Sequence, residues 1–85
     1  MPRELLLLKM QFAADRLDAI GALLLRTGAK VLSPDPSSYI VELAGTELEI
    51  GKFIAEVGGF GRIIEVVRGG VLGIARARLP AIKAS

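Results

Sequence analysis

The chain has 85 residues, enough for one small domain with a thin margin of stability. It contains no cysteine, which excludes disulfides, thiolate chemistry and zinc–sulfur sites, and no histidine, the commonest metal ligand and general base. The chain is 52% hydrophobic but only 5% aromatic, which indicates an aliphatic core, and its net charge of +2 is too small to indicate nucleic-acid binding.

The predicted elements begin with a strand over residues 4–12, which carries Leu6, Leu8, Met10 and Phe12 on one face. Residues 15–27 predict a helix, because leucine and isoleucine recur at helical spacing. Asp15 can cap its first turn, and Gly28 can end it in the left-handed conformation. Residues 29–33 and 38–44 then predict two short strands, joined as a hairpin by a turn rich in proline and serine.

The second helix is predicted over residues 46–57 by the clearest local signal in the chain. Thr46 and Glu49 can form a capping box, in which each side chain binds a free backbone amide of the first turn. Apolar residues follow at helical spacing, namely Ile50, Phe53, Ile54 and Val57. Gly58 and Gly59 then end the helix.

The last prediction is a hairpin over residues 60–76. Gly69 and Gly70 form its turn, because glycine readily takes the positive φ angles that a two-residue turn requires. In this register one face carries Ile63, Val67, Leu72 and Ile74, and the other carries Ile64, Val66, Val71 and Ala75. Both faces are apolar and need cover, which so short a chain can hardly supply. The hairpin therefore points to an interaction module.

The order of these elements is β-α-β-β-α-β with an additional C-terminal strand. It predicts an α+β, ferredoxin-like domain over residues 3–76, with two helices on one face of an antiparallel sheet. Residues 77–85 predict a flexible basic tail. The longest N-terminal apolar run is interrupted by Lys9, so no membrane span is expected. The first residues lack a signal-peptide layout, and we expect a cytoplasmic protein.

No catalytic, cofactor-binding or metal-binding residues are predicted. The glycine-rich run at residues 58–61 follows a helix, whereas a phosphate cradle leads into one. The serines have no histidine base, and Glu47 and Glu49 are typical of a helix start. The central strands lack the aromatic platform that RNA recognition requires, so no nucleic-acid partner is expected.

A partner interface is the remaining function class. It is predicted on the sheet face that the helices leave uncovered and on the last hairpin, at Leu5, Leu7, Ile63, Val67, Leu72 and Ile74. The alternative is that these side chains belong to an ordinary core. The expected occupant of the surface is a second copy of the chain or another protein.

Several short runs have the order and spacing of a known family. They are Arg3-Glu4-Leu5, Arg26 with Ala29-Lys30-Val31, Tyr39 with Val41-Glu42 and Gly45, and Phe60-Gly61 with Ile64-Glu65, Val67-Arg68 and Gly70. Over residues 3–76 the chain resembles the C-terminal domain of the small, regulatory subunit of acetolactate synthase.

This resemblance implies a non-catalytic role in branched-chain amino acid biosynthesis. In that family the small subunit binds a thiamine-diphosphate-dependent catalytic subunit, raises its activity and confers feedback inhibition, chiefly by valine. The family's amino-acid site lies in an N-terminal ACT domain, which has no counterpart here because the match begins at Arg3. The run Val57-Gly58-Gly59 also departs from the family, which usually has bulkier residues and a proline there. No ligand residue is carried over.

Two origins fit the missing half: an excised domain, or a short natural protein that retains only this module. An alternative function is a free-standing, ACT-like domain that self-associates and senses an amino acid.

Overall fold

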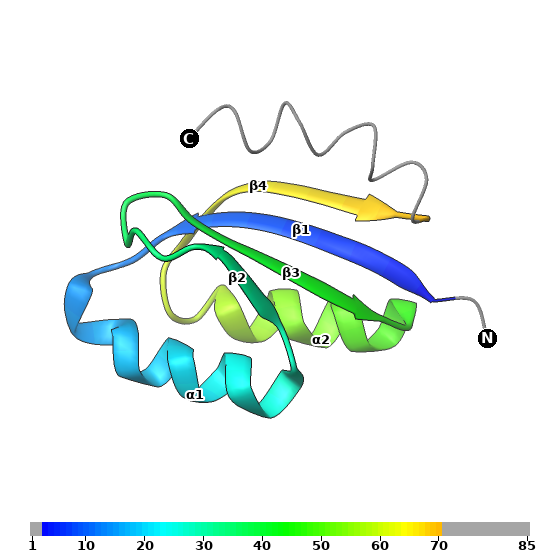
Figure 1. Cartoon of the computed structure of the whole chain (residues 1–85), viewed down its shortest axis with the longest axis horizontal. Helices are drawn as coiled ribbons and strands as arrows, with labels where there is room; N and C mark the ends of the chain where they lie inside the picture. Colours follow the sequence, from blue (N-terminus) through cyan, green and yellow to red (C-terminus); the bar gives the residue numbers. More distant parts are fainter. Residues whose placement is uncertain (1–2, 71–85) are drawn as a thin grey trace.

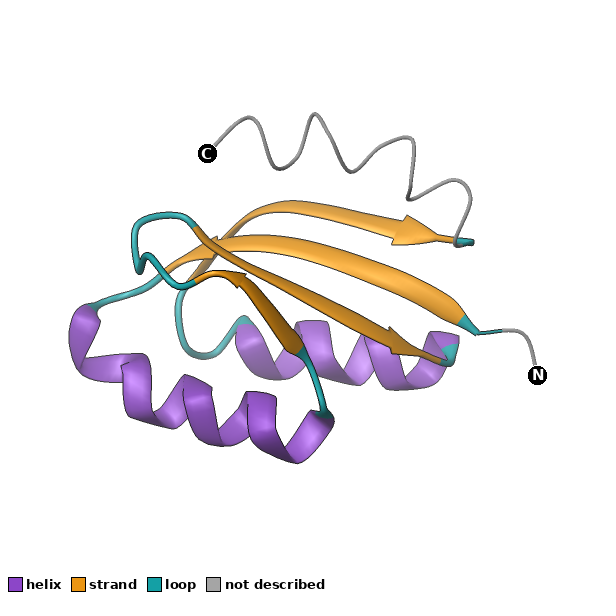
Figure 2. Cartoon of the chain, in the orientation of Figure 1, coloured by secondary structure: helices purple, strands orange, loops and turns teal. Residues whose placement is uncertain are grey.

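Four antiparallel strands and two helices make up residues 3–70, the part of the chain that the computed structural model describes. The elements are β1 (Glu4–Gln11), α1 (Leu17–Thr27), β2 (Lys30–Ser33), β3 (Tyr39–Gly45), α2 (Glu47–Val57) and β4 (Arg62–Gly69). The sheet order is β2-β3-β1-β4, and both helices lie on one face of it (Figures 1 and 2). The predicted ferredoxin-like α+β fold is confirmed. The predicted extra strand and the basic tail fall outside the described residues.

The main core lies between the sheet and the two helices. Strand β1 contributes Leu6, Leu8 and Met10, all buried, and Phe12 packs against them, as its alternating pattern predicts. The helices contribute Ile20, Leu23 and Leu24 from α1 and Ile50, Phe53 and Val57 from α2. Burial of each such side chain contributes about 1.5–3 kcal/mol, so this layer holds the helices on the sheet.

Two predicted helix signals are confirmed in atomic detail. The Thr46 hydroxyl accepts a hydrogen bond from the Glu49 amide at 3.2 Å, and the Glu49 carboxylate accepts one from the Thr46 amide at 2.8 Å. Gly28 has a φ of 79°, and its amide donates to the carbonyl of Leu24 at 2.9 Å. The start of α2 and the end of α1 thus satisfy backbone amide and carbonyl groups that have no partner within their own helix.

The predicted cap at Asp15 is wrong. Asp15 lies inside a 3-10 turn, Ala14–Arg16, that precedes α1, and α1 itself begins at Leu17 without a side-chain cap. The chain therefore enters the helix through a tighter turn whose N-cap is Ala13. Asp15 remains in the first turn of that entry, where a negative charge favours the backbone dipole.

A β-bulge in β4 changes which side chains share a face. Lys9 pairs with Glu65, but the next residue, Met10, pairs with Ile63, so Ile64 is the extra residue. Ile63 consequently packs against the helix-side core, while Val67 packs on the opposite face with Leu7. The prediction that Ile63 and Val67 share a face is therefore wrong, because the bulge interrupts the two-residue alternation of the strand.

No helix within residues 3–70 is long and apolar enough to cross a membrane.

Candidate interaction surface

The face of the sheet that points away from α1 and α2 is called the open face. It carries an apolar stripe to which every strand contributes one side chain: Leu32 from β2, Ile40 from β3, Leu7 from β1 and Val67 from β4. Leu7 and Ile40 are each only 2% exposed, and Leu32 and Val67 pack against them. The stripe thus crosses the whole width of the sheet.

Charged side chains flank the stripe in cross-strand pairs of opposite sign. Lys9 of β1 lies opposite Glu65 of β4, and Lys30 of β2 lies opposite Glu42 of β3. Directly opposed residues of an antiparallel ladder share a face, and opposite charges in such positions contribute about 0.2–1 kcal/mol. Lys9 lies on β1, one of the two inner strands of the sheet, and is 8% exposed. The open face is therefore apolar at its centre, with balanced charge around it.

The predicted interface residues are only partly brought together. Leu7 and Val67 are direct cross-strand neighbours, and Leu5 lies two residues along β1, half-buried, opposite Gly69. Ile63 lies on the other side of the sheet. Leu72 and Ile74 fall outside the described residues. The interface itself stays a prediction.

Ile40 and Leu32 belong to the same stripe but were absent from the predicted set. The alternation of residues along β3 puts Ile40 on the other face of the strand from Tyr39 and Val41, and this was the signal in the sequence that could have identified it. It could not reveal that β3 pairs with β1, or that Lys9 lies directly beside Ile40.

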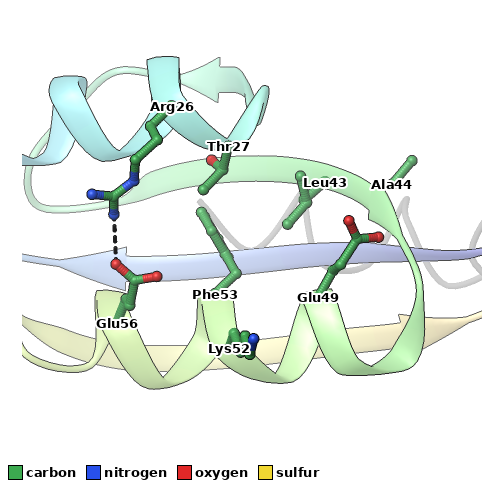
Figure 3. Close-up of a pocket in the computed structure, with 8 residues that line it drawn as sticks. All are labelled: Arg26, Thr27, Leu43, Ala44, Glu49, Lys52, Phe53 and Glu56. Atoms are coloured by element: carbon green, nitrogen blue, oxygen red, sulfur yellow. Dashed lines mark hydrogen bonds and ion pairs between the residues drawn. The ribbon is translucent and has the colours of Figure 1, made fainter.

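A concave region lies between the C-terminal end of α1 and the side of α2 (Figure 3). It has a volume of about 260 Å³ and is lined by Arg26, Thr27, Leu43, Ala44, Glu49, Lys52, Phe53 and Glu56. Arg26 and Glu56 form an ion pair of 2.6 Å across it, with side chains 66% and 49% exposed. Such exposed pairs contribute about 0–1 kcal/mol.

The carboxylate of Glu49 in this region is already engaged in the capping box. Hydrogen bonds from Thr46, chiefly from its backbone amide, hold the pKa of Glu49 below its ordinary value, so Glu49 stays ionised as a cap. Within residues 3–70 no cluster of three or more acidic, histidine or cysteine side chains could hold a metal ion. The geometry of this concave region favours a structural role.

The chain matches a known protein family. The family model described as the small subunit of acetolactate synthase matches residues 3–77. The small subunit of acetolactate synthase isozyme 3 is 32% identical in Escherichia coli K12 and 30% identical in Salmonella typhimurium LT2, each over 74 residues. Those matches cover 87% of this chain and 45% of each relative.

The fold has a matching relative among solved structures. The acetolactate synthase small subunit from Thermotoga maritima superposes with a TM-score of 0.70 at 25% sequence identity. The superposition covers 80% of this chain and 41% of that one. The chain thus spans less than half the length of the relatives that it matches.

Proposed function

The chain belongs to the family of acetolactate synthase small subunits, and on this basis we propose that it is a regulatory module that binds a catalytic acetolactate synthase subunit. The family match over nearly the whole chain carries this proposal. In the proposed complex the chain contributes no catalytic group. Its partner is a thiamine-diphosphate-dependent subunit, and both act in the cytoplasm.

The proposed contact lies on the open face where β1 and β4 meet. It comprises Leu5, Leu7 and Val67. The proposal keeps the predicted Leu72 and Ile74, which lie outside the described residues. Ile63 is left out, because it packs in the helix-side core. Leu5 and Val67 support this location, since both are half-buried and still have apolar area that a partner can cover.

Regulation through such a contact needs no chemistry. Burying apolar area contributes about 25 cal/mol per Å². A module that buries more area against one conformation of its partner shifts the partner's equilibrium toward that conformation. A contact made only in the active conformation would therefore raise activity.

The test mixes the full chain with the catalytic subunit from the same source and measures co-elution and acetolactate synthesis. We expect a complex and a rise in activity. Val67→Asp should weaken both effects at least tenfold, while Val66→Asp, on the opposite face of the same strand, should leave them nearly unchanged. Equal effects of the two substitutions would contradict the proposed contact.

Calorimetry with valine, leucine and isoleucine separates the alternative function. Saturable binding of any of these amino acids by the chain alone, without any complex with the catalytic subunit, would favour a self-associating amino-acid sensor over the regulatory module.

A further inference from the structure

Helix α1 and strand β2 together expose an apolar surface, called here the α1–β2 surface. Leu25 of α1 is 87% exposed, Leu17 of α1 is 44% exposed, and Val31 of β2 is 40% exposed. Leu17, Gly21 and Leu25 recur every four residues and therefore lie along one side of the helix. Helix α1 leads directly into β2, the first strand in the order β2-β3-β1-β4 (Figure 1). Single exposed leucines are ordinary, but a contiguous group of apolar side chains marks an interaction surface.

A hollow of about 330 Å³ lies in the α1–β2 surface. Its lining consists of uncharged residues, among them Gly21, Leu25, Gly28 and Val31. A Cβ atom at Gly21 would meet nothing within 4 Å, so this point of the helix surface is open. Leu25 stands about one helical turn further on and projects into solvent. The surface thus combines a protruding leucine with a gap beside it, and an apolar, uncharged partner fits both, because a charge buried there would have no counter-charge.

A second copy of the chain has the shape that this surface requires. Gly21 and Leu25 are about 6 Å apart along the axis of α1. Two copies can pack α1 against α1 in opposite directions, about a twofold axis at the level of Leu23. Leu25 of each copy then lies over Gly21 of the other, so one symmetric contact fills both gaps. Glycine also permits close approach of the two helices, because the distance between packed helices depends on the side chains at the contact.

The charges at the two ends of α1 favour the same antiparallel arrangement. Asp18 lies in the first turn of the helix and Arg26 in the last turn, and both are exposed. Antiparallel packing brings the acidic first turn of each copy beside the basic last turn of the other, which is electrostatically complementary. Parallel packing would instead bring like charges together. The position of the glycine and the charge pattern therefore select the same partner in the same orientation.

We propose that the chain forms a twofold dimer through the α1–β2 surface, with Leu25 of each copy seated at Gly21 of the other. Three exposed aliphatic side chains cover much less than the roughly 800 Å² per partner that a standard interface buries. We therefore expect a weak dimer that dissociates on dilution to about 1 μM. Helix α1 lies on the other side of the sheet from the open face (Figure 2). The dimer thus leaves the open face accessible to a catalytic subunit, and the two proposals can fail separately.

Sedimentation velocity of the full chain from about 1 μM to about 1 mM tests the dimer. We expect a monomer at the lowest concentration and a dimer at the highest. Leu25→Glu should raise the dissociation constant at least about tenfold, because it places a charge at the centre of the contact. The matched control is Leu48→Glu, at a side chain 69% exposed on α2, which should leave the dissociation constant nearly unchanged. A native chain that stays monomeric throughout, or equal effects of the two substitutions, would overturn the proposal.

A second experiment exchanges the leucine and the glycine between the two copies. Gly21→Leu fills the gap, and Leu25→Ala removes the side chain that occupies it, so each variant alone should dimerise at least about tenfold more weakly. An equimolar mixture of the two variants should regain the native affinity, because each contact in the mixed dimer again joins one leucine to one small residue. Leucine and alanine both favour helices, and circular dichroism at about 1 μM reports whether each monomer is folded. A mixture that dimerises no better than its two components would contradict the proposed contact.

Discussion

Leu7 of β1 lies directly opposite Val67 of β4, and both side chains stand on the face of the sheet that the helices do not cover. This pair joins the first strand of the fold to the last strand that the structure describes. Leu6 and Leu8, on either side of Leu7, point into the main core instead. Strand β1 is therefore apolar on both faces, which is typical of a strand covered on both sides.

Ile40→Ala tests how much packing on the open face of the sheet contributes to the stability of the protein. Ile40 is 2% exposed and packs with Leu7, so removal of its side chain should lower the free energy of unfolding by about 2–4 kcal/mol. Leu25→Ala, at a side chain 87% exposed on α1, should change it by less than about 0.5 kcal/mol. Urea denaturation measures both values. A loss below about 1 kcal/mol for Ile40→Ala would indicate that water already reaches this face.

Two glycines of α1 should respond to alanine with opposite signs. Gly28 has a φ of 79°, which alanine adopts only with strain, so Gly28→Ala should destabilise the protein by about 1–2 kcal/mol. Gly21 lies inside α1, and a Cβ there would meet nothing within 4 Å, so Gly21→Ala should stabilise it by about 0.5–1 kcal/mol. Thermal unfolding of the two variants compares these effects, and an unchanged or raised melting temperature for Gly28→Ala would contradict the assigned C-cap.

The capping box predicts a loss of stability in acid. Hydrogen bonds from Thr46 lower the pKa of Glu49 from its ordinary value of 4.5, and bonds from the amide and hydroxyl of Ser37 lower the pKa of Asp35 from 3.8. Each folded-state pKa is thus below its unfolded value. The stabilisation is complete above the unfolded value and is lost as pH falls through the folded one. The urea midpoint should therefore fall as pH drops below 4.5.

Glu49→Gln separates the contribution of the capping box from that of Asp35. The variant should show a shallower fall of the urea midpoint in acid, with the remaining part due to Asp35. Glu47→Gln removes a carboxylate from the same helical turn without disturbing the capping box, and serves as the control. If both variants kept the full acid dependence of the native chain, the capping box would not be its source.

The sequence predicted those features that depend on neighbouring residues. Thr46 with Glu49, and Gly28 after a helical run, are local signals, and alternation along β1 placed Leu6 and Leu8 together on one face of the strand. Sequence reasoning missed features that depend on how strands meet. The bulge at Ile64 carries no glycine or other local mark, because it arises from the register between β4 and β1. The place of Ile40 in the apolar stripe of the open face was not predicted for the same reason, because it depends on the pairing of β3 with β1.

The bulge makes Ile64 a position where β4 can lose a residue. Deletion of Ile64 joins Ile63, the partner of Met10, directly to Glu65, the partner of Lys9, and so restores an uninterrupted ladder. Deletion of Val66 would instead send Val67 to the opposite face, because a one-residue slip reverses every side chain beyond it. Deletion of Ile64 should leave a folded protein in which the edge strand β4 is straighter. Deletion of Val66 should disrupt the pairing of β4 with β1. Amide hydrogen exchange of β1 would distinguish the two results, because exchange should become faster only after the deletion of Val66. Strand β4 thus contains one residue whose removal would shorten the strand without changing which of its side chains enter the core.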